Sequence, residues 1–204
     1  MYFLIKGIVL GFSIAAPVGP IGILCIRKTL QFGRLSGFFS GLGAALADMI
    51  YGSIAAFGLT IISNALLASQ FWLKLIGGIF LGYLGIKTFF SKSMKQEDKK
   101  LTHQPLLKDF ITTFFLTLTN PMTIIAFLGI FAGLGLSNTD GNLLQTSLLV
   151  IGVFLGSFLW WLVLSEFVTF FRKKIEEKMM RWINRIAGLI IFGFGVFALS
   201  GLFN

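Results

Sequence analysis

Long apolar segments follow one another along this 204-residue chain, separated by short polar stretches. They fall near residues 3–26, 35–60, 71–90, 110–135, 143–171 and 183–203. Each contains the roughly 20 residues that an α-helix needs to cross the hydrocarbon core of a membrane. Only 12% of all residues are charged, against about 25% in soluble domains. The pattern predicts an all-α membrane protein with six transmembrane helices.

Basic residues gather in alternate loops between these segments. Lys and Arg cluster in residues 27–34, 91–109 and 172–182, whereas Asp140 is the one charged residue in the loops between them. Cytoplasmic loops carry the excess of Lys and Arg, so the basic loops are predicted inside and both termini outside. Basic loops beside anionic lipid also explain the net charge of +9, which therefore does not indicate a nucleic-acid partner.

The two halves of the chain align with each other at an offset of about 110 residues. The aligned pairs include Pro17 with Pro121, Gly43 with Gly152, Asp48 with Ser157, Gly78 with Gly188, and Gly85 with Gly195. Three spans per half is an odd number, so the second half would enter the membrane upside down. We expect two inverted three-helix repeats, residues 1–90 and 110–204, joined by a cytoplasmic linker loop at 91–109. Shared packing glycines without common ancestry are the alternative.

Proline interrupts the first and fourth apolar segments, at Pro17 and Pro20 and at Pro121. Proline has no N–H to donate, and its ring clashes with the carbonyl of residue i−4. Gly19 before Pro20 and Asn120 before Pro121 also fit the start of a new helix. We therefore expect helices 1 and 4 to be broken, with their freed backbone groups lining a wet cavity.

The freed groups suggest what such a cavity would bind. The carbonyls of Ser13, Ala16 and Thr117 are expected to lose their helical partners. The new helix N-termini would direct amide groups and positive dipole ends towards the membrane midplane, where they suit a carboxylate. Simple kinks in packed helices are the alternative interpretation.

Asp48 is the one charged residue between Arg34 and Lys74. A carboxylate deep in a membrane helix costs a few kcal/mol on insertion scales, and it normally faces the bundle interior or a wet cavity. Asp48 would suit an ammonium group or a coupling proton, although it could instead only bond neighbouring helices. An amino acid, which carries both charges, would complement the two helix breaks and Asp48 together.

Other polar residues receive simpler interpretations. Lys74 and Lys87 lie near the two ends of the third span and are expected to extend to the lipid headgroups. Glu166 lies close to the basic loop at 172–182 and is expected at the inner interface. The single cysteine, Cys25, has no partner at metal-ligand spacing, so we expect neither a resident metal nor a cofactor.

Small residues on the second span raise the question of subunit association. Gly37, Gly41 and Gly43 would let helices approach closely, so a homo-oligomer is one expected arrangement. The oligomeric state itself does not follow from the sequence.

Three motifs resemble those of the lysine exporter (LysE/RhtB) family of bacterial amino-acid translocators. They are A-A-P-V-G-P-I-G in the first span, A-D-x-x-Y-G in the second and T-N-P-M in the fourth. The resemblance implies a multi-pass protein of the bacterial inner membrane that exports basic or neutral amino acids with the proton-motive force. By family, the residues to carry over are Pro17, Gly19, Pro20, Asp48, Asn120 and Pro121. Val18 within the first motif and Met122 after the third leave the substrate open.

These observations predict a secondary transporter that exports amino acids or similar small zwitterions and is coupled to the proton gradient. Asp48 is the candidate for proton coupling. A divalent metal-ion exporter of the cadmium type, from the same superfamily, is the alternative. An assembly factor without transport activity is a further one. We see no Ser/His/Asp set, no HExxH and no phosphate loop, so the sequence does not indicate an enzyme.

Overall fold

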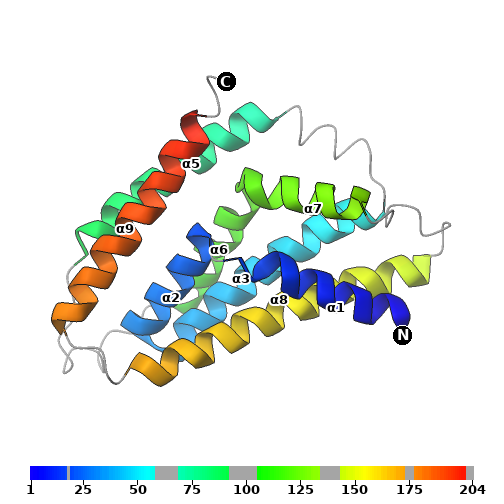
Figure 1. Cartoon of the computed structure of the whole chain (residues 1–204), viewed down its shortest axis with the longest axis horizontal. Helices are drawn as coiled ribbons and strands as arrows, with labels where there is room; N and C mark the ends of the chain where they lie inside the picture. Colours follow the sequence, from blue (N-terminus) through cyan, green and yellow to red (C-terminus); the bar gives the residue numbers. More distant parts are fainter. Residues whose placement is uncertain (18, 58–68, 92–104, 134–142, 173–176, 201–204) are drawn as a thin grey trace.

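The computed structural model describes the chain except residues 18, 58–68, 92–104, 134–142, 173–176 and 201–204 (Figure 1). Every element in the described part is an α-helix. The helices are α1 (Tyr2–Ala15), α2 (Pro20–Phe32), α3 (Arg34–Ala56), α5 (Gln70–Phe89), α6 (Leu106–Leu118), α7 (Pro121–Gly133), α8 (Leu143–Arg172) and α9 (Glu177–Ser200). The expectation of an all-α protein is confirmed.

Four of these helices, α3, α5, α8 and α9, are each long and apolar enough to cross a membrane. The pair α1 and α2, bent by 81°, forms a fifth candidate span. The fourth apolar segment of the sequence is divided between α6 and α7, which have 13 residues each. At 1.5 Å per residue each is about 20 Å long, too short to cross a core about 30 Å thick. The chain is therefore a multi-pass membrane protein with four to five candidate spans.

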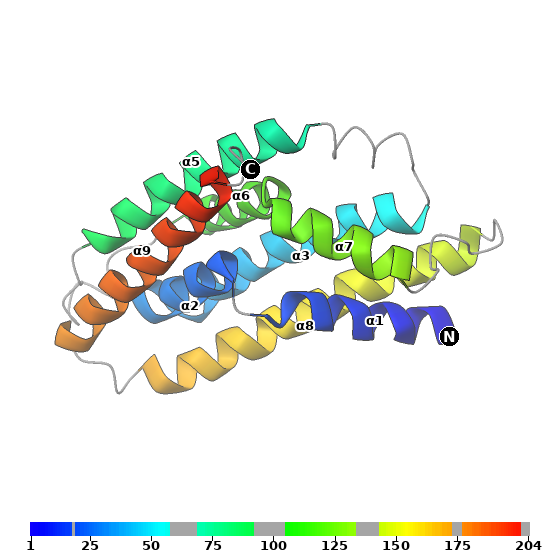
Figure 2. The ribbon, with the colours of Figure 1, turned by 45° about the horizontal axis from the view of Figure 1, so that its top comes forward.

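The long helices α3 and α8 pack against each other at the centre of the molecule. Helix α1 lies along α8, α6 lies along α3, and α5 and α9 form a separate antiparallel pair, visible in both Figure 1 and Figure 2. Glycine permits these close approaches: a Cβ on Gly152 would lie 2.8 Å from the Cα atom of Gly7. Contacts between backbones thus fix α1 against α8.

The glycines that suggested subunit association instead pack α3 against other helices of the same chain. Gly37, Gly41 and Gly43 are all buried. A Cβ on Gly37 would run into the Thr29 side chain of α2, a Cβ on Gly41 into the Trp161 side chain of α8, and a Cβ on Gly43 into the backbone of α6. These three residues therefore pack α3 within one chain and do not present a surface for a second subunit.

The helix ends that adjoin the basic loops lie together. The last residues of α2, α5 and α8 and the first residues of α3, α6 and α9 gather at the left of Figure 1. The expected loop at 27–34 is wrong, however, because α2 continues to Phe32 and α3 begins at Arg34. Only Gly33 separates them, with a φ of 104° that favours glycine. Most of the expected linker at 91–109 lies outside the described residues.

Candidate functional site

A cavity of about 660 Å³ lies between the two helix breaks, α3 and the α5–α9 pair. Five of the six residues singled out from the sequence line it: Pro17, Gly19, Pro20, Asp48 and Asn120. The sixth, Pro121, begins α7 directly after Asn120. Residues from the first, second and fourth apolar segments therefore meet at one place, as the sequence predicts.

Asp48 forms part of the cavity wall at the centre of the molecule. The Ser157 hydroxyl on α8 donates a hydrogen bond of 2.6 Å to Oδ2 of Asp48. The indole Nε1 of Trp161 in turn donates to Oγ of Ser157 at 3.1 Å. Trp161 also lines the cavity, so it both packs the core and borders the site. This chain of hydrogen bonds holds the carboxylate in a fixed position on the contact between α3 and α8.

The first helix break presents a helix N-terminus to the cavity. Gly19 precedes α2, Pro20 occupies its first turn, and the Gly19 carbonyl accepts from the N–H of Ile23 at 3.1 Å. Ile21 and Gly22, also in that first turn, line the cavity. The first N–H groups of a helix lack partners within the helix, and they carry the positive end of its dipole. The expected restart at Gly19-Pro20 is confirmed.

The second break differs from the expectation in one respect. Helix α6 ends at Leu118 and α7 begins at Pro121, as predicted. The carbonyl of Thr117 was expected to lack a partner, but it accepts from the N–H of Asn120 at 3.1 Å. The Tyr51 hydroxyl donates to the carbonyl of Leu118. The N–H of Asn120 and the Tyr51 hydroxyl thus provide hydrogen-bond donors for the last carbonyl groups of α6. This break therefore offers the cavity fewer free carbonyls than expected.

Lys74 is a cavity residue that the sequence did not identify. It was interpreted as extending to the lipid headgroups, whereas the structure places it, half-buried, among the lining residues. The lining also includes Thr117 and Thr123 from the second break, and Phe197 from α9. Apolar spacing alone does not show which face of α5 is turned towards α6 and α7, so no sequence signal marked Lys74.

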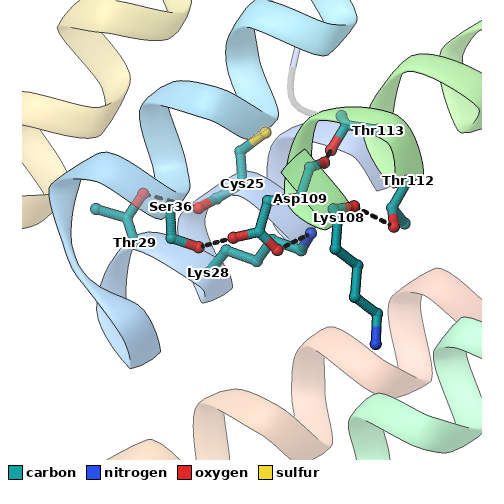
Figure 3. A network of polar contacts seen from close by, with 8 residues as sticks. All are labelled: Cys25, Lys28, Thr29, Ser36, Lys108, Asp109, Thr112 and Thr113. Carbon is teal, nitrogen blue, oxygen red and sulfur yellow. Dashed lines mark hydrogen bonds and ion pairs between the residues drawn. The ribbon is translucent and has the colours of Figure 1, made fainter. Parts of the chain in front are cut away.

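A second polar cluster lies outside the cavity, between α2, α3 and α6 (Figure 3). The Lys28 ammonium lies 2.6 Å from Oδ1 of Asp109, and the Ser36 hydroxyl donates to Oδ2 of Asp109 at 2.5 Å. All three residues are buried, and none lines the cavity. The sequence assigned Lys28 to a basic loop. Neutralisation by Asp109 explains why Lys28 can instead lie in a buried helix.

Arg27, next to Lys28, fixes α2 to the other side of the molecule. Its Nε donates to Oδ1 of Asn184 on α9 at 3.0 Å, and its Nη2 donates to Oγ of Ser91, just beyond α5, at 2.8 Å. Near this end of the molecule, α2 is therefore tied by polar contacts to α3, α6 and α9. Within the described residues, no group of three or more His, Cys, Asp or Glu is placed to hold a metal ion.

Comparison with known proteins agrees with this geometry. The LysE type translocator family matches residues 12–201. The chain is 31% identical over 198 residues to a putative amino acid efflux protein, YcgF, of Bacillus subtilis, covering 95% of this chain and 94% of that protein. It is 23% identical over 193 residues to the arginine exporter protein ArgO of Pectobacterium carotovorum, covering 93% and 92%. No solved structure matches significantly. The chain therefore belongs to the LysE-type translocator family, as its motifs predict, and is a transporter rather than an enzyme.

Proposed function

We propose that this protein is a secondary transporter of the bacterial inner membrane that exports amino acids or similar small zwitterions in exchange for protons. The observation that carries the proposal is that Asp48 and both helix breaks border one cavity. An ionisable residue inside a membrane protein, lining a cavity and without an ion pair among the described residues, is by default a candidate functional residue. Transporters commonly place that site between broken helices at the interface of inverted repeats.

The contact between Asp48 and Ser157 supports the inverted-repeat arrangement. These two residues are equivalent in the alignment of the two halves, and in the structure they are joined by a hydrogen bond. A two-fold axis that relates the halves brings two equivalent residues into contact when each of them lies close to the axis. We therefore place such an axis in the membrane plane, through the contact between α3 and α8.

The packing of α5 against α9 supports the same axis. A Cβ on Gly195 would lie 2.9 Å from the carbonyl oxygen of Gly78, and a Cβ on Gly188 would lie 2.8 Å from that of Gly85. The alignment pairs Gly78 with Gly188 and Gly85 with Gly195. Exchanging the halves therefore turns one contact into the other, which shared glycine content alone does not require.

The cavity and the basic loops lie towards opposite ends of the molecule. The cavity lining includes Lys74, near the start of α5, and Ser200, at the end of α9. The contacts of Arg27 and Lys28 lie at the other end, beside the basic loops. With basic loops in the cytoplasm, we propose that both termini lie outside and that the cavity opens outward and is closed on its inner side.

A transport cycle follows from this arrangement. Asp48 takes up a proton from outside, and the halves then rock around the fixed site. The inner contacts of Lys28 and Arg27 separate and expose Asp48 to the cytoplasm. There the carboxylate releases its proton and binds the substrate ammonium group. Return to the outward-facing form releases the substrate, so one proton enters for each substrate exported.

Purified protein in liposomes tests the proposal. Vesicles loaded with individual labelled amino acids should release one or more of them faster when the outside is made acidic. Asp48→Asn should lower this release to the rate of protein-free vesicles, because the amide can neither carry the proton nor neutralise an ammonium group. Glu166→Gln is the matched control: its side chain is 42% exposed, pairs with Arg34 and lies outside the cavity.

Three results would contradict the proposal. Normal release by the Asp48 variant would remove this residue from the mechanism. Release that ignores the pH gradient would exclude proton coupling. Movement of cadmium ions with no movement of any amino acid would favour the metal-exporter alternative.

A further inference from the structure

We infer that α2 is the inner gate of the cavity, and that the route from the cavity to the cytoplasm runs along the faces of α3 and α6 that α2 covers. Ser40 and Thr113 line this route when α2 moves away. The inference rests on the proposed function. It adds the helix that moves and the residues that the leaving proton and the entering substrate pass.

One face of α3 carries a row of small side chains from the buried ion pair to the cavity. The row begins at Ser36, whose hydroxyl donates to Asp109 (Figure 3). Residues four apart share one face of a helix, so Ser40 and Ala44 continue the row, and Ala44 lines the cavity. Ser40 is fully buried, and its hydroxyl has no hydrogen-bond partner in the part of the chain that the structure describes. A buried hydroxyl without a partner is costly, and this one gains a partner in water or substrate when the route is open.

A matching row follows α6, which lies along α3. It begins at Asp109 and continues one turn at a time through Thr113 and Thr117, and Thr117 lines the cavity. Both threonine hydroxyls donate at 2.8 Å to the carbonyl four residues earlier. Their oxygens therefore remain able to accept a further hydrogen bond. Together the two rows offer a polar path between the ion pair and the cavity.

Helix α2 closes this path in the present form. Its residue Cys25 belongs to one buried apolar cluster with Ala44 of α3 and Leu116 of α6. Lys28, one turn further along α2, pairs with Asp109. Apolar packing and the ion pair thus hold α2 over both rows.

The two ends of α2 allow it to move as one unit. At one end it is bent by 81° from α1, and at the other end only Gly33 separates it from α3. Gly33 has a φ of 104°, which glycine adopts without steric cost. A few residues at the ends of elements absorb the backbone changes of a hinge motion, so these two positions suit a gate.

The second half of the chain places a similar helix differently. Helix α7, like α2, has 13 residues, begins at a proline after a helix break and precedes a long central helix. Helix α2 packs closely against α3, which follows it, whereas the described residues of α7 make no comparable contact with α8. In the inward-facing form of an inverted-repeat transporter the two halves exchange these arrangements. We therefore expect α7 to close against α8 while α2 leaves α3.

Cysteine labelling of the full-length protein in membrane vesicles tests the route. Ser40→Cys and Thr113→Cys are introduced singly together with Cys25→Ala. A membrane-impermeant trimethylammonium methanethiosulfonate is then applied from the side of the basic loops. Both cysteines should react roughly tenfold faster than Ser165→Cys, because a minor open form exposes groups that are otherwise buried. Acidifying the opposite side should raise both rates, since protonation of Asp48 precedes the inward turn in the proposed cycle.

Ser165 is a matched control because it is buried at a similar depth. A Cβ on Gly37, one turn before Ser40, would lie 3.0 Å from the Ser165 hydroxyl oxygen. Ser165 therefore lies against the face of α3 that is turned towards α8. A cysteine there should stay unreactive if the route follows α6.

A second pair of variants tests the movement of α2. Arg27→Gln, added to Ser40→Cys, weakens the contact of α2 with Asn184 on α9. It should raise the labelling rate roughly tenfold, as expected from the loss of a hydrogen bond made by a charged group in the closed form. Arg34→Gln removes the same charge from an exposed ion pair at the start of α3 and should leave the rate unchanged.

The inference is overturned if Ser165→Cys reacts as fast as Ser40→Cys and Thr113→Cys, or if neither of these two reacts although the protein transports. Thr113→Cys decides alone if Ser40→Cys does not fold. An unchanged or lower rate in Arg27→Gln would also overturn it. Amino-acid release without labelling would refute only the route, whereas the expected labelling without any amino-acid transport would refute the proposed substrate and leave the gate.

Discussion

Two buried carboxylates in this protein have opposite surroundings. Asp109 is 1% exposed and is satisfied within the protein by the Lys28 ammonium and the Ser36 hydroxyl. Asp48 is 4% exposed, accepts a hydrogen bond from Ser157 and has no ion pair among the described residues. It lines the cavity, whereas Asp109 does not.

The difference shows that burial alone does not identify a functional acid. The charge of Asp109 is neutralised by a lysine on a neighbouring helix, so it joins α2, α3 and α6 in the folded state. The charge of Asp48 meets a neutral hydroxyl on one side and the cavity on the other. A buried acid without a cationic partner, beside a cavity, remains able to exchange its proton or bind a cation.

The largest expected effect on stability is that of Asp109→Ala. Removing one partner of a buried ion pair leaves the other charge uncompensated and costs about 3–5 kcal/mol. The free energy of unfolding should fall by that amount, which denaturant titration of the detergent-solubilised protein would measure. Asp48→Asn, which removes no ion pair among the described residues, should change it by less than about 1 kcal/mol.

A double variant sharpens this comparison. Replacing a buried ion pair with apolar residues of similar size is often neutral or stabilising. Lys28→Met combined with Asp109→Leu should therefore recover most of the lost stability. If the double variant is as unstable as Asp109→Ala alone, the cost arises from something other than the unpaired lysine. A loss of stability in Asp48→Asn equal to that in Asp109→Ala would remove the distinction between the two acids.

The sequence singled out Asp48 but did not single out Asp109. Asp48 is conspicuous because it is the one charge in a long apolar run. Proline indicates both helix breaks because it lacks an N–H and clashes with the preceding turn of its own helix. Such local signals predicted both helix breaks and five of the residues that line the cavity. They were sufficient because a charge inside an apolar run and a proline without an N–H are both visible in the sequence immediately around them.

Pairing between distant segments could not be predicted in the same way. Lys28 and Asp109 lie at the ends of apolar segments, where a charge normally faces water, and only the packing of α2, α3 and α6 against one another buries them together. The role of Tyr51 in partnering the Leu118 carbonyl and the position of Lys74 likewise depend on which helix faces are in contact. Amino-acid periodicity does not determine those contacts.

A smaller effect is expected from removing the hydrogen-bond partner of Asp48. Ser157→Ala deletes the hydroxyl that donates to Asp48 and leaves Nε1 of Trp161 without its acceptor. A typical hydrogen bond contributes about 1 kcal/mol, which corresponds to about fivefold in an equilibrium constant. The substrate concentration for half-maximal transport should change by about that factor, without abolishing transport.

Ser165→Ala is the control for this prediction. Ser165 is also buried on α8, two turns further along the helix, and does not line the cavity. It should leave transport unchanged. Complete loss of transport in Ser157→Ala would mean that the serine, and not only the carboxylate, takes part directly in the mechanism.

The smallest effect is expected at a third carboxylate, Glu166. It pairs with Arg34 on the surface, where the two side chains are 42% and 63% exposed. Water screens exposed pairs of this kind, and most contribute less than about 1 kcal/mol. Glu166→Gln should therefore change the free energy of unfolding by a few tenths of a kcal/mol, and salt should reduce even that difference. Denaturant titration at low and high salt would measure it. A cost as large as that of Asp109→Ala, unchanged by salt, would show that exposure does not explain why one acid–base pair stabilises the fold and the other does not.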